Sequence, residues 1–328
     1  MAKKEIRLFA QPSTIWDKII IYQEEKMEKR IGFIGLGAMG NPMSKNLIKK
    51  GYKLTVYDIV NEKTEAIVKE GAEPARSSKE VAEKSEVIIT MVLSSPHVRE
   101  VILGKGGIIE GVKKGSIVID MSTIDPMTTR EISNLLSDKG VKMLDAPVAR
   151  AVPAAIAGTL AIFVGGEKET FEKCKDILSA MGTDLHYIGD SGAGEVVKII
   201  NNLIVATQQA LLSEALVLGV KAGVKPEVLW KALSTGSANS FILQNQIKNL
   251  VMKGKFEKGV FPVDYMIKDL GLALAMGAKY HVPLYFGSLA TQAYELARAA
   301  GYSERHAPIV IKPLEDLVGV EVRGKIED

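Results

Sequence analysis

Cysteine and histidine are scarce in this sequence, and their scarcity excludes two kinds of site. The chain of 328 residues has one cysteine, Cys174, which excludes an internal disulfide and a cysteine-based metal cluster. The four histidines are scattered and form neither an HxxxH pair nor a cluster with acids. We therefore expect no bound metal. A chain with one thiol is typical of a reducing compartment, so the sequence predicts a cytoplasmic protein.

Neither sign of charge dominates, and the longest apolar stretch is interrupted by polar residues. The net charge is +3, and Lys and Arg are interspersed with Asp and Glu. This pattern argues against a surface for nucleic acid or for anionic lipid. The apolar stretch 195–222 contains Lys198, Gln208 and Glu214, which do not suit a membrane span. We expect a small-molecule partner, and neither nucleic acid nor membrane.

Residues 1–28 are predicted to be an appendage in front of the first domain. Their apolar stretch, 15–22, is short and contains charged residues, so it does not fit a secretory signal. Met27 is a natural start for the domain that follows, because the first strand begins a few residues later. We expect residues 1–26 to carry no chemistry.

The most informative stretch is a glycine-rich turn between a strand and a helix. An apolar run at 31–35 is typical of a buried strand, and a helical pattern covers 42–49. The next strand, 53–58, ends in Asp58. The turn has the GxGxxG spacing of a dinucleotide-binding unit, so its residues and Asp58 are candidate cofactor-binding residues. The turn residues are Gly35, Leu36, Gly37, Ala38, Met39 and Gly40.

Each glycine of the turn has its own physical reason. Gly35 permits the tight turn, Gly37 lets the backbone approach a pyrophosphate, and Gly40 lets helix and strand pack closely. The helix N-terminus presents N–H groups and the positive end of its dipole to the phosphates. Asp58 can accept hydrogen bonds from a ribose 2′-OH and would repel a 2′-phosphate. These properties favour NAD as the cofactor, with NADP as the alternative.

Strand-like runs alternate with helical spacers in the first part of the chain. This alternation predicts an α/β Rossmann domain with a mostly parallel sheet covered on both faces. It stops in the glycine-rich segment 189–194, so residues 29–190 are assigned to the NAD-binding domain. The predicted strands lie at 31–35, 53–58, 87–92, 116–121, 142–146 and 160–164.

Residues 191–328 are predicted to form an all-α C-terminal domain that binds substrate and joins subunits. A long helix is expected over 195–222; it is apolar on nearly all sides and should be buried on most of them. Further helical patterns cover 226–234, 240–252, 263–279, 284–299 and 305–317.

Lys198 and Asn202 stand out on this long apolar helix. They are four residues apart and so share one face. A lysine in such a helix is costly unless it is paired or functional. One interpretation is catalysis, because the glycine-rich hinge points this face toward the cofactor domain. The other is a lysine that reaches the surface or pairs with an acid such as Glu195.

A second candidate segment, 120–126, follows a strand of the cofactor domain. Loops at the carboxyl ends of such strands line the ligand crevice. Ser122 and Thr123 could hydrogen-bond a small polar substrate and the nicotinamide end of the cofactor. Asp125 and Pro126 instead fit a helix N-cap and the first helical position. Both interpretations can hold, because they use different residues.

Several segments together resemble the β-hydroxyacid dehydrogenase family, which includes 3-hydroxyisobutyrate dehydrogenase and tartronate semialdehyde reductase. They occur in the family's order and extend from about residue 30 to the last helices, which makes the resemblance specific. The segments are 35–43, 120–126, 145–148, 158–160, 192–202 and 268–270.

The resemblance implies roles for several residues. Lys198 matches the family's catalytic lysine, Asn202 the asparagine that orients the substrate, and Ser122 a substrate-carboxylate contact. Thr123 and Lys268 match cofactor contacts. The family's cofactor loop corresponds here to Val92, Leu93 and Ser94, with a changed sequence. Members of the family also imply a homodimer or homotetramer.

One loop departs from the family pattern. Where the family has a glycine-rich Ser-Gly-Gly loop that approaches the substrate, this chain has Ala149, Arg150 and Ala151. Arg150 is a planar double donor suited to an anion, so Ala149 and Arg150 are candidate substrate-binding residues for an acidic substrate. The alternative is a surface arginine. A similar arginine occurs in sulfolactaldehyde reductases and some related semialdehyde or serine dehydrogenases, which leaves the substrate open.

The resemblance implies hydride transfer between NAD(H) and a small β-hydroxy acid or its semialdehyde, with Lys198 as general acid/base. A lysine of ordinary pKa, about 10.4, is protonated at neutral pH and suits carbonyl reduction, whereas oxidation needs a lowered pKa. Succinic semialdehyde or glyoxylate reduction is an alternative within the family. The 6-phosphogluconate dehydrogenases and the imine reductases are nearby alternatives. The pairing of Lys198 with Asn202 argues against a non-catalytic dinucleotide-binding module.

Overall fold

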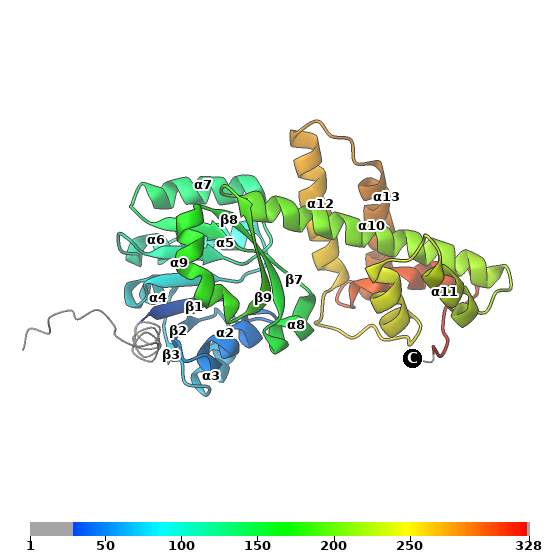
Figure 1. Ribbon diagram of the computed structural model, residues 1–328, viewed down its shortest axis with the longest axis horizontal. Helices are drawn as coiled ribbons and strands as arrows, with labels where there is room; N and C mark the ends of the chain where they lie inside the picture. The colour runs from blue at the N-terminus through cyan, green and yellow to red at the C-terminus, as the bar shows by residue number, and fades with distance from the viewer. Residues whose placement is uncertain (1–28, 327–328) are drawn as a thin grey trace, which may run out of the picture.

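The computed structural model describes residues 29–326, so the predicted appendage, residues 1–28, lies outside the described residues. Within the described part, strands alternate with helices up to Gly189, and helices alone follow (Figure 1). The strands are β1 (Arg30–Ile34), β2 (Lys53–Tyr57), β3 (Glu73–Pro74), β4 (Val87–Thr90), β5 (Ile117–Asp120), β6 (Lys142–Asp145), β7 (Val148–Ala149), β8 (Leu160–Gly166) and β9 (Gly182–Gly189).

Helices connect these strands, and local sequence explains several of their boundaries. Helix α7 begins at Pro126, and its N-cap residue Asp125 accepts a hydrogen bond from the Thr128 backbone N–H at 3.0 Å, as predicted. Ser77 caps α4 in the same way, by accepting from the Glu80 N–H at 3.1 Å. The helices are α2 (Gly40–Lys49), α3 (Asn61–Val68), α4 (Ser78–Lys84), α5 (Ser95–Leu103), α6 (Ile108–Gly111), α7 (Pro126–Ser137), α8 (Ala151–Ala157) and α9 (Lys168–Ser179).

The strands form one nine-stranded sheet in the order β3-β2-β1-β4-β5-β6-β8-β7, with β9 paired to β8. The pairs from β3 across to β6 are all parallel; for example, Ile31 lies opposite Leu54 on one side and Val87 on the other. Strand β8 is antiparallel to β6 and β7 and parallel to β9. The strand order reverses between β1 and β4, and open α/β sheets bind ligands at the carboxyl ends of strands at such a point.

Two apolar clusters close the two faces of the sheet. One joins the strands to α2, α8 and α9, with buried side chains such as Met43 and Phe171. The other joins them to α4, α5, α6 and α7, with Val98 and Ile132 among its members. The fold class is therefore the predicted α/β Rossmann arrangement followed by a helical part.

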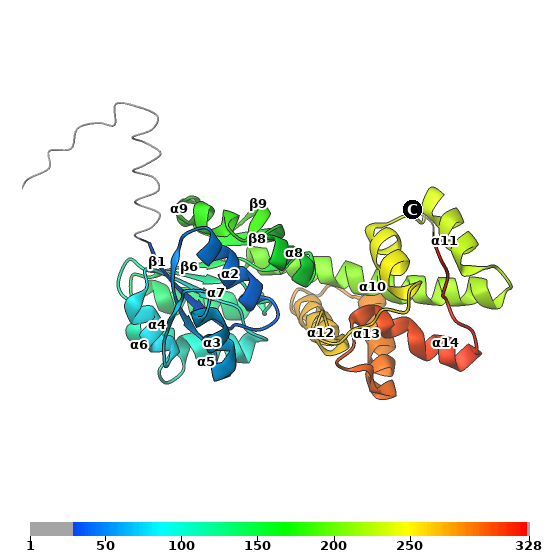
Figure 2. The ribbon, with the colours of Figure 1, turned by 90° about the horizontal axis from the view of Figure 1, so that it is seen from below.

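Helix α10 (Ala193–Lys221) leads from the sheet into the helical part and forms its axis (Figures 1 and 2). Helices α12 and α13 both pack against it. The remaining elements are α11 (Pro226–Thr235), the π-helical η1 (Ile242–Val251), α12 (Val263–Lys279), α13 (Tyr285–Ala297), the π-helical η2 (Arg298–Tyr302), the 3₁₀-helical η3 (Ala307–Ile311) and α14 (Lys312–Val318).

Among the described residues, α10 is long and apolar enough to cross a membrane by length and composition alone. Within the structure, 39% of its most apolar window is buried. A buried helix of a large protein passes the same test. Its polar side chains Glu195, Lys198 and Asn202 are all buried. The expectation that α10 is buried on most sides was too broad, because Ile204 and Leu211 are 51% and 62% exposed.

The predicted strands and helices are present, with differences that have physical reasons. Strands β3 and β7 have two residues each, too few to show an alternating pattern, and the half-exposed β9 was not predicted either. The segment predicted as one helix over 305–317 is a 3₁₀ turn followed by α14, and a proline lies at the start of each piece. The predicted helix 284–299 continues as η2, which is interrupted by Gly301 with φ +86°.

The start of α10 is pressed against the sheet. The Asp145 carboxylate, at the end of β6, accepts hydrogen bonds from the backbone N–H groups of Gly192 at 2.7 Å and Glu195 at 3.1 Å. A sheet residue therefore satisfies N–H groups that every helix leaves open at its first turn. A Cβ on Gly194 would lie 2.3 Å from the Phe163 carbonyl oxygen, so glycine is required for this close approach.

Gly194→Ala is expected to destabilise the protein by about 1–3 kcal/mol, because the added methyl group forces the helix away from the sheet. The matched control is Gly271→Ala in α12, where a Cβ would meet nothing within 4 Å. That change should be neutral or stabilising by about 0.5–1 kcal/mol. Urea unfolding of both variants measures the difference, and equal stabilities would contradict the proposed tight junction.

Candidate active site

The glycine-rich turn between β1 and α2 has the geometry that its spacing predicts. Gly35 has φ +93°, in the left-handed region that favours glycine. A Cβ on Gly40 would lie 1.9 Å from the Gly35 carbonyl oxygen, so a side chain there is excluded. A Cβ on Gly37 would meet nothing within 4 Å, which leaves its backbone open to a ligand. This combination fits a pyrophosphate held against the start of α2.

Asp58 lies directly beside this turn. Its Oδ2 accepts a hydrogen bond from the Leu36 N–H at 2.7 Å, and its Oδ1 accepts one from the Val60 N–H at 2.9 Å. The half-exposed Lys63 places its Nζ 3.9 Å from Oδ1. The carboxylate is therefore fixed where an acid at the end of the second strand meets a ribose.

A cavity of about 430 Å³ opens beside the turn, between α2 and α8. Ala38 and Asn41 line it from the turn and from α2, and Val152 and Ile156 line it from α8. Of the predicted turn residues, Leu36 is buried in the core, Met39 is half-buried and Ala38 is exposed. Ala38 is therefore the turn side chain most open to a ligand.

Three buried side chains form a hydrogen-bonded chain between α10 and α12. Lys198 Nζ donates to Asn202 Oδ1 at 3.1 Å, and Asn202 Nδ2 donates to Asp269 Oδ2 at 2.5 Å. Lys198 is 8% exposed. Lys198 therefore does not reach the surface, and within the described residues it makes no ion pair with Glu195. The acid in its hydrogen-bonded network is Asp269, which it reaches through Asn202.

Lys268 connects this hydrogen-bonded network to the loops that follow β4 and β5. Its Nζ donates to the carbonyl oxygens of Thr123 at 2.7 Å and Leu93 at 3.2 Å, and lies 3.0 Å from Asp269 Oδ1. Thr123 follows β5 and Leu93 follows β4. The predicted cofactor residues of these two loops are thus tied to α12, next to the Lys198 network.

Burial lowers the pKa of Lys198 below the ordinary lysine value, because the ammonium group loses its hydration. Asp269 opposes this shift, Lys268 adds to it, and Glu195 opposes it. The pKa of Lys198 is therefore not the ordinary value expected from the sequence. A lowered pKa makes the neutral amine more accessible, so this side chain can serve as acid or as base.

Ser122 is fully buried, and its hydroxyl group is engaged within the protein. Its Oγ donates to Asp120 Oδ1 at 2.6 Å and accepts from the Val92 N–H at 2.9 Å. Thr90 Oγ1 also donates to Asp120 Oδ1, at 2.8 Å. Ser122 therefore connects the loop after β4 to the end of β5 by hydrogen bonds. Its contact with a substrate remains a prediction. Nearby, Ser94 Oγ lies 2.7 Å from His97 Nδ1.

The structure places Arg150 on a different set of partners from Lys198. Its guanidinium group donates to Asp184 Oδ2 at 2.6 Å and to the Thr159 carbonyl oxygen at 3.0 Å, and it is half-exposed. Arg150 and Ala151 have φ of +83° and +59°, values that favour glycine. This loop thus carries two side chains in a backbone conformation that favours glycine. Ala149 lies half-buried on β7, directly before this turn.

Three acidic residues that organise the site were not predicted as site residues from the sequence: Asp269, Glu195 and Asp145. Asp269 completes the Lys198 network, Glu195 accepts from the Ile124 N–H at 3.2 Å, and Asp145 caps α10. The available signal was an acid within or next to an apolar helix, or at the end of a buried strand. In residues 29–326, no group of three histidine, cysteine or acidic side chains is suited to a metal ion.

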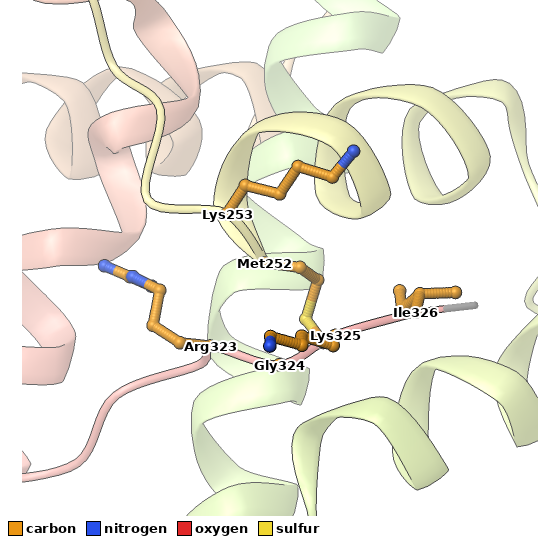
Figure 3. Close-up of a pocket in the computed structure, with 6 residues that line it drawn as sticks. All are labelled: Met252, Lys253, Arg323, Gly324, Lys325 and Ile326. Carbon is orange, nitrogen blue, oxygen red and sulfur yellow. The ribbon is translucent and has the colours of Figure 1, made fainter. Parts of the chain in front are cut away.

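A cavity of about 690 Å³ lies far from this chemistry, where the C-terminal segment crosses the end of η1 (Figure 3). Lys253 and Arg323 extend in different directions from it (Figure 3). Arg323 is already bound to the buried Glu315 at 2.7 Å and lies over the Phe256 ring. Arg323 is thus used for packing the C-terminal segment.

Two protein-family models together match nearly the whole described chain. A family model described as the NAD binding domain of 6-phosphogluconate dehydrogenase matches residues 30–189. A second, described as NAD-binding of NADP-dependent 3-hydroxyisobutyrate dehydrogenase, matches residues 192–314. The two matches meet between β9 and α10.

Curated relatives cover most of the chain. A 2-(hydroxymethyl)glutarate dehydrogenase from Eubacterium barkeri is 40% identical over 300 residues, which cover 91% of this chain and 99% of that protein. The mitochondrial 3-hydroxyisobutyrate dehydrogenase of Mus musculus is 39% identical over 291 residues, which cover 87% of each chain.

Among solved structures, the 3-hydroxyisobutyrate dehydrogenase of Mycobacterium tuberculosis with L-serine has a TM-score of 0.81 and 30% identity, covering 87% of this chain and 99% of that one. An imine reductase from a Pseudomonas species has a TM-score of 0.57 at 21% identity, covering 87% of this chain and 99% of that one, and shares the fold alone.

Asp269→Asn is expected to lower the pKa of Lys198 further, because it removes an anion that stabilises the ammonium form. The neutral amine should then appear at lower pH than in the unmodified protein, whose midpoint is itself expected below the ordinary value of about 10.4. NMR titration of isotope-labelled lysine side chains measures both midpoints. Asp264→Asn, an exposed change on the same helix, is the control. An unchanged or raised Lys198 midpoint in Asp269→Asn would contradict this account.

Proposed function

Because the chain belongs to the β-hydroxyacid dehydrogenase family, whose members are NAD(P)-dependent hydroxyacid oxidoreductases, we propose that Lys198 is its general acid/base. The enzyme moves a hydride between NAD(H) and a small β-hydroxy acid or the corresponding semialdehyde. The observation that carries the role of Lys198 is its buried hydrogen bond to Asn202, close to loops that carry predicted cofactor residues.

The residues of the chain divide the work. The bound nicotinamide supplies the hydride donor or acceptor. The turn 35–40 and Asp58 hold the dinucleotide, and Thr123 and Lys268 are proposed to contact it near the reacting end. Lys198 Nζ gives a proton to the forming alkoxide oxygen during reduction and takes it back during oxidation. Asn202 holds the amine in place and is proposed to orient the substrate beside it.

We propose that Arg150 adds recognition of a second anionic group on the substrate, together with the adjacent Ala149 backbone. The relative named as a 2-(hydroxymethyl)glutarate dehydrogenase acts, by its name, on a dicarboxylate. The Arg150–Asp184 pair is half-exposed, and such pairs contribute only about 0–1 kcal/mol, so a substrate carboxylate can replace Asp184 at low cost. Ser122, which matches a substrate-carboxylate contact of the family, is proposed for the same contact here.

We further propose a homodimer or homotetramer in the cytoplasm. Ile204, Leu211 and Leu218 are exposed on α10 at intervals of seven residues, and Leu289 and Leu296 repeat this spacing on α13. Helices that pair through such a stripe bury it against one another. The single cysteine is buried, which agrees with a reducing compartment. Sedimentation equilibrium measures the assembly state, and a monomer at micromolar concentration would contradict the proposed homodimer or homotetramer.

The substrate is identified by a direct screen. NADH oxidation is followed with succinic, methylmalonic, tartronic and sulfolactic semialdehydes and with glyoxylate, and the reverse reaction with 3-hydroxyisobutyrate, 2-(hydroxymethyl)glutarate and serine. Turnover of at least one acidic member is expected. Turnover of none of them would contradict the proposed substrate class.

Lys198→Met is expected to lower kcat by about 10²–10⁴-fold, the usual contribution of a positioned acid/base. The affinity for NADH, measured by fluorescence titration, should be retained, because the glycine-rich turn lies on another element. Lys221→Met, at the exposed end of the same helix, is the control. Normal turnover by Lys198→Met would refute the mechanism.

NAD(H) is expected to be preferred over NADP(H), because the Asp58 carboxylate would repel a 2′-phosphate. Asp58→Asn removes this charge and keeps an acceptor for the Leu36 N–H. The ratio of kcat/KM for the two cofactors should therefore shift toward NADP(H) by about tenfold or more, equivalent to about 1.4 kcal/mol. Glu62→Gln, a neighbouring acid on α3, should leave the ratio unchanged. A tenfold preference for NADP(H) in the unmodified enzyme would overturn the assignment.

Arg150→Ala is expected to raise KM about 10–150-fold for an acidic semialdehyde and little for a neutral aldehyde of similar size, because a charge-assisted contact contributes about 1.5–3 kcal/mol. Alanine retains the Cβ at this left-handed position, so the backbone cost is similar. Asp184→Asn is the control: it breaks the ion pair but keeps the arginine, and should not raise KM. Equal losses on both aldehydes would show that Arg150 is only structural.

A further inference from the structure

The carboxyl group of Glu195 is completely buried where α10 meets the sheet. Its Oε2 accepts a hydrogen bond from the Ile124 backbone N–H at 3.2 Å. Its Oε1 has no hydrogen-bond partner within the described residues, and no Lys or Arg there forms an ion pair with it. A buried charge in this position would be neither paired nor fully hydrogen-bonded, which is costly.

Glu195 takes part in two hydrogen bonds that hold the start of α10 against the sheet, one through its backbone N–H and one through its side chain. Asp145 of β6 accepts from the Gly192 and Glu195 N–H groups at the start of α10, and the Glu195 side chain accepts from Ile124 in the loop after β5. In a capping box, an N-cap side chain and a glutamate three residues later satisfy each other's N–H groups. Here Glu195 also lies three residues after the N-cap residue Gly192, but its partners come from distant segments.

The loop after β5 is therefore held at two adjacent residues by two different helices. The Thr123 carbonyl oxygen accepts from Lys268 of α12, and the Ile124 N–H donates to Glu195 of α10. Lys198 lies three residues beyond Glu195, on the same side of α10. The contact to Ile124 thus sets where Lys198 lies relative to Ser122 and Thr123.

We propose that Glu195 is a positioning residue for the reaction: as a neutral carboxylic acid, it locks the loop after β5 to α10 and so fixes Lys198 opposite the reacting groups. This proposal rests on the proposed role of Lys198. A neutral carboxyl group still accepts from the Ile124 N–H through its carbonyl oxygen, so the lock does not need the charge.

The charged groups around Glu195 favour this protonation state. Asp120 of β5 and Asp145 of β6 are two further buried carboxyl groups, while Lys198 on its own helix and Lys268 on α12 are the cations. Burial, followed by repulsion from Asp120 and Asp145, raises the pKa of Glu195 well above its ordinary value. Hydrogen bonding to Ile124 and the charge of Lys268 oppose this only in part.

The test compares Glu195→Gln, which is neutral and keeps an acceptor, with Glu195→Leu, which has similar size and none. Gln should retain kcat, KM and the slow hydrogen exchange of the Ile124 amide. Leu should lower kcat about 10–100-fold, the size of effect that a small misplacement produces, with little change in NADH affinity. It should also lose the Ile124 protection. Glu214→Gln, an exposed change on the same helix, is the control.

A second readout follows stability against pH. Above the unfolded-state pKa of about 4.3, the folded protein keeps a proton on Glu195 that the unfolded chain releases. Stability from this group therefore falls as pH rises from there toward its raised folded-state pKa. Glu195→Gln removes this loss, so its Tm minus that of the unmodified protein should increase with pH above about 5. A constant difference would show that Glu195 is charged and overturn the neutral form.

The outcomes separate this proposal from the proposed function. Loss of turnover in Glu195→Gln equal to that in Glu195→Leu would overturn it, as would full activity or full Ile124 protection in Glu195→Leu. If Glu195→Leu does not fold, the smaller change Glu195→Ala replaces it, with the same kcat and Ile124 exchange readouts, while Glu195→Gln tests the neutral form through the Tm difference. Normal turnover by Lys198→Met would refute the proposed function instead, while leaving the Ile124 protection and the pH-dependent Tm unaffected.

Discussion

The site depends on the contact between the Asp145 carboxylate and the first N–H groups of α10. This contact places the start of a 29-residue helix against the end of a buried strand, and Gly194 makes the close approach sterically possible. A helix turns by about 100° per residue, so a shift of one residue at its start would rotate Lys198 away from the loops that follow β4 and β5. The contacts at the helix N-terminus, less than two turns before Lys198, therefore determine where the lysine lies.

The second constraint is electrostatic. Burying a lysine costs free energy, and the chain offsets part of that cost with Asn202 and the nearby Asp269, both of which are buried too. Asp269 is shared with Lys268, whose ammonium group reaches the carbonyl oxygens of Leu93 and Thr123. One polar network therefore connects the helical part to the sheet part. Burial excludes water from the Lys198 amine and lowers its pKa, and Asp269 opposes this shift only in part, which suits proton exchange in both directions.

Much of the fold could be predicted from the sequence, because local residue patterns determine many of its turns, strands and helix boundaries. The GxGxxG turn, the apolar strands and the Asp125–Pro126 helix start all have a short-range physical cause, and the structure reproduces them. Lys198 and Asn202 were recognisable because two polar residues share one face of an apolar helix. Asp145, Glu195 and Asp269 were not, since their roles depend on partners 47 to 71 residues away along the chain.

Arg150 shows the limit most clearly. Its residue type suggests anion binding, but whether its side chain lies on Asp184 or turns toward a substrate depends on a loop in which Arg150 and Ala151 both have positive φ. Sequence composition cannot distinguish these two positions, because both satisfy the same guanidinium group. The exposure of Ile204 and Leu211 was missed for a related reason, since an apolar stripe looks the same whether its own chain or another copy covers it.

The most direct test of the account is a crystal structure of the enzyme with NAD and a slow or inert β-hydroxy acid. We expect Lys198 Nζ within about 2.6–3.2 Å of the substrate hydroxyl oxygen, the range in which a proton can be exchanged. Asn202 should still be bonded to Asp269, and Ile124 to Glu195. A substrate hydroxyl group bound to any other ionisable side chain, with Lys198 out of reach, would contradict the central claim.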